Sequence, residues 1–188
     1  MEVIMENKKT FANRLLYEYG LWDKLNNIGK AHIIGSYRMD MIVGNDLDID
    51  VVNLEMSNEK LYELTKYIIE TFNPVWYQAK QEVNDEGKTV WFHGFETTIL
   101  GERWNVDIWF FDQETIDKAE AYNDNICKKI KDNSAKKEAI ISIKNALIAR
   151  GLYSFDKYTS MHVYDAVLNK NLSTFDEFIK RIEINNKL

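Results

Sequence analysis

Three aspartates occupy every second position of one short segment. Asp46, Asp48 and Asp50 alternate with aliphatic residues in the run NDLDID at 45–50. Because side chains alternate between the two faces of a β-strand, we expect the three carboxylates to project from one face. Like charges this close repel each other, and a cation or contact with water has to offset that cost. The run therefore predicts a cation site or a solvated strand face.

The solvated strand face is the plain alternative, because runs of charged residues usually lie on the surface. A calcium-binding loop is excluded. Its pattern requires Gly at the sixth and Glu at the twelfth position, where this chain has Val51 and Ser57.

A fourth aspartate, Asp107, lies in the strongly apolar run WNVDIWFF at 104–111. Aspartate is depleted in strands, so an acid in this setting indicates a group held at the edge of the core for a purpose. An ion pair in the core with Arg103 or a lysine is the alternative explanation.

Gly35 and Ser36 directly follow a short β-branched segment. The backbone amides of a glycine turn, together with a serine hydroxyl, are suited to bind phosphate oxygens. Arg38 lies just past this turn, where it would pair either with a phosphate or with the nearby aspartates.

These residues, in this order, resemble the polymerase-beta-type nucleotidyltransferase superfamily. The superfamily has Gly-Ser or Gly-Gly, about ten residues, Asp-x-Asp or Asp-x-Glu, and a third acid on a later strand. Within it, the chain is most similar to the small bacterial antibiotic transferases. The segment GSYRMD at 35–40 is similar to their Gly-Gly-Trp-x-x-Asp, 45–50 resembles the Asp-Ile-Asp run of lincosamide nucleotidyltransferases, and 106–108 resembles their Leu-Asp-Ile. The resemblance covers residues 30 to 112.

The resemblance implies a role for each of these residues. Asp46 and Asp48 would hold a metal-bound nucleoside triphosphate, and Gly35 and Ser36 would grip its phosphates. Asp107 would bind a second metal and act as the base toward an acceptor hydroxyl. Two Mg²⁺ ions and ATP are the implied cofactor and nucleotide. A shifted pair, Asp48 and Asp50, is the alternative, because an apolar strand follows it directly; we adopt Asp46 and Asp48.

We therefore expect an enzyme that transfers AMP to a hydroxyl of a small molecule, such as an aminoglycoside or lincosamide antibiotic, and releases pyrophosphate. One alternative is a nucleotidyltransferase that modifies a protein partner, as in toxin–antitoxin pairs. A non-catalytic nucleotide-binding module and, third, a metal-dependent nuclease are the others. The net charge of −6 argues against nucleic acid as a partner, because Lys and Arg supply most of the affinity for phosphate backbones.

The elements that have to position these residues form an α+β module followed by helices. The spacing of apolar residues and the residues that start or end helices and strands predict a mixed β-sheet flanked by helices over 1–112, as a catalytic domain. They predict a C-terminal helical bundle over 113–188. The expected helices are 7–27, a segment capped by Ser57 and ended by Pro74, 113–131, 135–149, 158–169 and 174–184. A capping box from Thr174 to Glu177 is expected to start the last of them. The expected strands are 31–34, 47–54, 75–83, 88–99 and 103–111.

Composition fits a folded chain of this kind. The chain has 188 residues, of which 45% are hydrophobic, one cysteine and three histidines. No intramolecular disulfide can form, and the histidines are not spaced for a zinc site, so oxygen atoms must hold any metal. No run approaches the roughly 20 apolar residues of a membrane span. We expect a cytoplasmic protein without a membrane partner.

Overall fold

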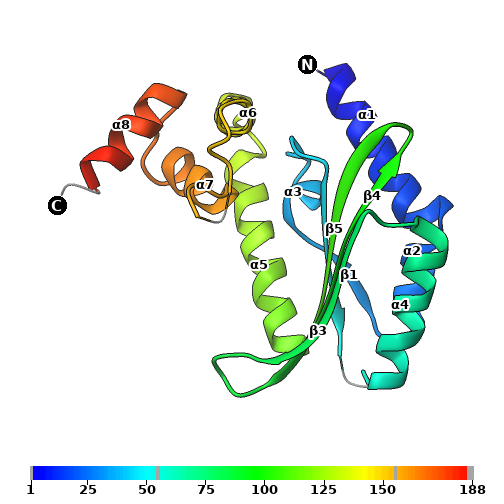
Figure 1. Cartoon of the computed structure of the whole chain (residues 1–188). Helices are drawn as coiled ribbons and strands as arrows, with labels where there is room; N and C mark the ends of the chain where they lie inside the picture. Colours follow the sequence, from blue (N-terminus) through cyan, green and yellow to red (C-terminus); the bar gives the residue numbers. More distant parts are fainter. Residues whose placement is uncertain (1, 54–55, 155, 186–188) are drawn as a thin grey trace. The chain divides into compact units, whose positions relative to one another are not determined.

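The computed structural model describes residues 2–53, 56–154 and 156–185. The chain divides into two compact units between Tyr122 and Asn123. The first unit contains the sheet, and the named elements in the described residues of the second are helices (Figure 1). The assignment of 1–112 as a catalytic domain and 113–188 as a helical domain stays a prediction.

The sheet has five strands in the order β1-β2-β5-β4-β3. Their bounds are β1 Ala31–Ile33, β2 Asp46–Val52, β3 Trp76–Val83, β4 Thr89–Ile99 and β5 Glu102–Phe111. β2 and β5 are parallel, and every other neighbouring pair is antiparallel. The predicted mixed sheet is confirmed. Each predicted strand is found within two residues of its expected bounds, except that Leu54, the expected end of the second strand, lies outside the described residues.

One face of the sheet forms the hydrophobic core of the first unit. On β2, Leu47, Ile49 and Val51 are at most 1% exposed. They belong to one cluster with the apolar residues of helix α4 (Asn58–Phe72) and of the N-terminal helices. In Figure 1, α1, α2 and α4 lie together along this side of the sheet. Hydrophobic burial therefore fixes which way β2 faces.

The N-terminal segment differs from the single helix expected over 7–27, and that prediction is wrong. The segment consists of α1 (Glu2–Asn13), a π-helical stretch η1 (Arg14–Glu18) and α2 (Leu21–Asn26). Gly20 between them has φ +77°, a left-handed conformation that ends a right-handed helix. The apolar spacing continues across the break because residues of both pieces, such as Leu16 and Leu21, enter the same core.

Local end signals on the other helices are confirmed. The backbone N–H of Lys60 donates to Ser57 Oγ at 3.3 Å, so Ser57 is the predicted N-cap of α4. In the second unit, Thr174 and Glu177 form the predicted capping box, with reciprocal hydrogen bonds of 3.3 and 3.2 Å. The bounds there are α6 Ser134–Ala149, α7 Ser160–Leu168 and α8 Phe175–Asn185; α5, Gln113–Ile130, runs from the first unit into the second.

None of the helices in the described ranges is both long and apolar enough to cross a membrane.

Candidate metal centre

The parallel pairing of β2 and β5 brings acids from both strands together. Asp48 lies opposite Asp107 in the register, and Asp46 lies opposite Asn105. One carboxylate oxygen each of Asp46, Asp48 and Asp107 can be chosen so that all three lie within 4.8 Å of one another. We call these three residues the acidic triad. The structure thus brings together the three acids to which the resemblance gives a metal.

The Gly35 turn contacts the acidic triad. Helix α3 (Gly35–Arg38) follows β1 directly, and Gly35 has φ +69°. A Cβ atom added at Gly35 would lie 2.1 Å from Asp48 Oδ2, so only glycine leaves room for the carboxylate beside the backbone. The N–H of Ile34 also donates to the backbone oxygen of Asp48 at 3.1 Å. Gly35 therefore lies directly against Asp48, and the phosphate-binding role of Gly35 and Ser36 stays a prediction.

The carboxylates of the acidic triad repel one another, and a bound cation would relieve this repulsion. The pKa of Asp107 is raised to about 6, chiefly by burial and also by the negative charge of Asp46, against a hydrogen bond from Asn105 that lowers it. Asn105 Nδ2 also donates to Asp46 Oδ1 at 2.9 Å. Mg²⁺ takes oxygen ligands and is often held by one or two carboxylates together with substrate phosphates. The donor set of the triad therefore fits a Mg²⁺ site.

Asp50 has a different setting from the triad. It is 2% exposed and lies opposite His32 on β1 and Trp109 on β5. Burial raises its pKa to about 7, with a further contribution from the negative charge of Glu120. Asp50 is not in the triad, although β2 places it on the same face. Which two aspartates of β2 bind metal stays a prediction.

Arg38 is held by a helix of the same unit. Its NH1 group lies 2.6 Å from Glu120 Oε1, and His32 Nδ1 lies 3.0 Å from the same oxygen. Hydrogen bonds from His32 and then from Arg38 lower the pKa of Glu120, against the effect of burial. Glu120 is therefore an ion partner of Arg38, as the structural alternative expected. Its role in nucleotide binding stays a prediction.

Sequence reasoning did not single out Glu120, His32 or Asn105 as site residues. Glu120 lies in the polar pattern of α5, where an acid is expected to face solvent. Asn105 is one of two polar residues in the apolar run of β5, and this is the one feature that could have pointed to it.

Comparisons with known proteins identify the fold. No protein-family model matches the sequence, and no curated protein matches it at a significant level. Solved structures do match. The Cid1 poly(U) polymerase with Mg and 3′-dATP bound aligns over 86% of this chain and 49% of its own, with a TM-score of 0.59 and 15% identity.

Two further matches are complexes of a non-canonical poly(A) polymerase. GLD-2 with GLD-3 aligns over 89% of this chain and 58% of its own, with a TM-score of 0.51 and 13% identity. GLD-2 with RNP-8 aligns over 89% and 64%, with a TM-score of 0.50 and 11% identity. The chain thus spans about half to two thirds of the length of these polymerases. Its fold is the nucleotidyltransferase fold.

Proposed function

We propose that this chain is a Mg²⁺-dependent nucleotidyltransferase that transfers AMP from ATP to a hydroxyl group and releases pyrophosphate. The observation that carries the proposal is the acidic triad beside the Gly35 turn, on adjacent parallel strands of a nucleotidyltransferase fold. Three converging carboxylates next to a glycine turn match the needs of triphosphate chemistry better than those of a solvated strand face.

In the proposed reaction, Asp46 and Asp48 would hold the triphosphate through bound Mg²⁺, and the backbone of Gly35 and Ser36 would orient its phosphates. Two Mg²⁺ ions held by the acidic triad would supply charge stabilisation at the attacking and leaving oxygens of an in-line displacement. The acceptor hydroxyl gives its proton to the carboxylate of Asp107, and its oxygen forms a bond to the α-phosphorus. The bond from the α-phosphorus to the bridging oxygen breaks, and pyrophosphate leaves with that electron pair.

Asp107 suits the role of base because burial raises its proton affinity. Metal binding opposes this by lowering the pKa of a nearby carboxylate. Proton transfer to Asp107 is most effective where these two opposing influences leave its pKa near the working pH.

For the acceptor we propose a small molecule with a hydroxyl group, in the manner of the antibiotic transferases. The net charge of −6 supports this choice, because an acidic protein attracts cationic acceptors such as aminoglycosides and repels phosphate backbones.

An RNA 3′ hydroxyl is the second candidate acceptor, and a specific observation favours it. The matched structures named above are poly(U) and poly(A) polymerases. This is in tension with the expectation that nucleic acid is an unlikely partner, and charge alone does not decide the matter because local basic groups can bind RNA on an acidic protein.

One experiment separates these acceptors. The protein is incubated with Mg²⁺ and each of the four ribonucleoside triphosphates, together with an aminoglycoside, a lincosamide, or an RNA oligonucleotide with a free or a blocked 3′ end. Release of pyrophosphate and the mass of the acceptor are measured. We expect an acceptor heavier by one adenylyl group, that is by AMP less one water, and no reaction with Asp48→Asn.

The matched control is Asp85→Asn, which removes the same charge from the exposed turn between β3 and β4. It should react like the wild type. RNA extended only when its 3′ end is free would replace the small-molecule acceptor by RNA. Mg²⁺-dependent binding of ATP without any transfer would indicate the non-catalytic nucleotide-binding module.

A further inference from the structure

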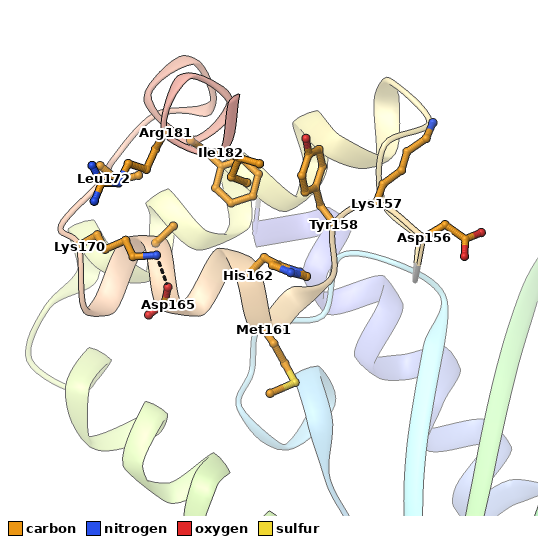
Figure 2. A pocket seen from close by; sticks show the side chains of 12 residues that line it. Asp156, Lys157, Tyr158, Met161, His162, Asp165, Lys170, Leu172, Arg181 and Ile182 are labelled. Atoms are coloured by element: carbon orange, nitrogen blue, oxygen red, sulfur yellow. Dashed lines mark ion pairs between the residues drawn. The ribbon is translucent and has the colours of Figure 1, made fainter. Parts of the chain in front are cut away.

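A pocket of about 540 Å³ lies in the second unit, between α7, α8 and the loops that flank α7 (Figure 2). This volume is in the range of pockets that bind small molecules. The pocket shares no residue with the acidic triad, and all of its lining belongs to the second unit.

The floor of the pocket is apolar and aromatic. Phe178 and Ala166 are 1% and 5% exposed, so the pocket reaches the core of this unit. The ring of Tyr158 meets the ring of Phe178 edge to face, with centroids 5.5 Å apart. Tyr158 is only partly buried, and its ring also meets the ring of His162 edge to face, with centroids 6.4 Å apart.

The rim of the pocket is rich in hydrogen-bond donors. Lys170 Nζ lies 2.6 Å from Asp165 Oδ2, and Asn169 Nδ2 donates to Asp165 Oδ1 at 3.0 Å. These bonds lower the pKa of Asp165 and use both of its oxygens. The carboxylate is therefore compensated, and Lys170 keeps two further N–H donors.

Arg181 is the second cationic hydrogen-bond donor on the rim. It is exposed, and it makes no hydrogen bond or ion pair with the residues that the structure describes. In the view of Figure 2, Arg181 and Lys170 lie on one side of the pocket and Tyr158 on the other. A planar guanidinium beside an ammonium group is suited to a phosphate.

His162 adds one more donor. Its Nδ1 accepts from the backbone N–H of Thr159 at 3.1 Å in the capping box of α7. In the neutral ring the hydrogen must then lie on Nε2. The neighbouring loop residues Asp156 and Lys157 offset each other in charge, so Arg181 leaves the pocket with an excess of positive charge.

We propose that this pocket binds a phosphate monoester that carries an aromatic ring, with the ring on Tyr158 and Phe178 and the phosphate between Arg181 and Lys170. This inference goes beyond the proposed nucleotidyl transfer and does not depend on it. The ligand would act at a second site, separate in its residues from the triad.

The test uses phenyl phosphate as the probe, because it has the ring and the phosphate but no triphosphate for the triad. The full chain is titrated in EDTA, and the ring C–H signals of the histidines are followed by NMR. His32 and His93 are buried and His162 is exposed, so the three can be told apart. We expect saturable shifts of the His162 signals, and weaker binding of phenol and of inorganic phosphate alone.

Variants test which side chains contact the phenyl phosphate probe. Arg181→Gln should raise the dissociation constant of phenyl phosphate about tenfold, since it removes a charge-assisted hydrogen bond. Tyr158→Leu should also weaken binding. The matched control is Lys180→Gln, which removes an equal charge from the adjacent exposed position of α8 outside the pocket lining and should leave binding unchanged. The double variant Asp46→Asn/Asp48→Asn should bind like the wild type.

Unchanged His162 signals, or equal weakening by Arg181→Gln and Lys180→Gln, would overturn the proposal. Loss of binding in the double variant would also overturn it, because the probe would then be at the triad. Tighter binding of AMP than of pyridoxine 5′-phosphate would support a nucleotide as the natural source of this chemistry, and the reverse order would support another ring phosphate.

Discussion

On one face of β2, Leu47, Ile49 and Val51 are at most 1% exposed and are packed in the core, whereas Asp46 and Asp48 on the other face remain partly exposed beside Asp107. The same seven-residue strand thus carries two kinds of side chain with opposite requirements. Leaving water is favourable for the apolar side chains of the core face and unfavourable for the carboxylates of the acidic face. We expect stability to depend on the first face and catalysis on the second, and each substitution below tests this separation.

The largest effect is expected at Asp48. Asp48→Asn should lower the rate of nucleotidyl transfer about 1000-fold or more, since it removes a ligand of the metal that stabilises the reacting oxygens. The melting temperature in EDTA should be unchanged or higher, because the substitution relieves repulsion within the triad. Pyrophosphate release measures the rate of transfer, and circular dichroism measures the melting temperature. A variant that melts much earlier would show that the acidic face also holds the fold together.

Leu47 tests the core face of the same strand. Leu47→Ala should lower the free energy of unfolding by about 3 to 4 kcal/mol, the usual cost of such a cavity in a core. Urea denaturation measures it. The control is Leu100→Ala at a position 67% exposed, where the change should stay within about 0.5 kcal/mol. Equal effects at the two positions would contradict the assignment of this face as the core.

Asp50 tests the boundary between the two kinds of face, since it shares the acidic side of β2 but is buried. The native state raises its pKa to about 7, above the value of an unfolded chain, so it binds the proton more tightly than the unfolded state does. Its favourable contribution is present at low pH and is lost as the pH rises toward 7. Relative to the wild type, Asp50→Asn should therefore gain about 2 kcal/mol of stability between pH 5 and pH 8.

Denaturation in EDTA at several pH values checks this prediction, with Asp85→Asn as the exposed control that should show no such gain. Nucleotidyl transfer by Asp50→Asn should fall less than about tenfold if Asp46 and Asp48 are the metal pair. A loss as large as that of Asp48→Asn would instead assign the metal to Asp48 and Asp50.

His93 is a titratable side chain buried in the core, and its protonation provides a test of that region. It is 0% exposed, and its Nδ1 lies 2.9 Å from the hydroxyl of Tyr77, which lies 2.7 Å from Thr65 Oγ1. Thr65 donates its own proton to the backbone oxygen of Leu61. Tyr77 must then donate to Thr65, and His93 must donate from Nδ1, which leaves its buried Nε2 without a partner among the described residues.

Burial lowers the pKa of His93 to about 4. The unfolded chain takes up this proton near pH 6.5, so stability is lost as the pH falls from about 6.5 toward 4. The wild type should lose about 1 to 2 kcal/mol more over this range than His93→Gln, which cannot titrate. Parallel pH profiles of the two proteins would rule out this effect. The exposed His162→Gln is the control.

The local elements could be predicted from the sequence because their signals act over a few residues. Strand bounds, the Ser57 cap and the capping box of Thr174 and Glu177 depend on neighbours within one turn. The N-terminal break could not be found this way. Periodicity follows the face that a segment buries, and two helical pieces on either side of Gly20 bury the same face.

The sequence by itself determined that Asp46, Asp48 and Asp50 share a face of one strand, because a strand alternates its side chains whatever it pairs with. Only the tertiary structure decided which of them meet Asp107. The parallel register of β2 and β5 sets Asp48 against Asp107 and Asp50 against Trp109. That register joins residues about 60 positions apart and depends on how the whole core packs, so no local pattern contains it. The same packing brought Glu120 to Arg38 and His32, and left Gly35 as the position where the backbone makes room for the carboxylate of Asp48.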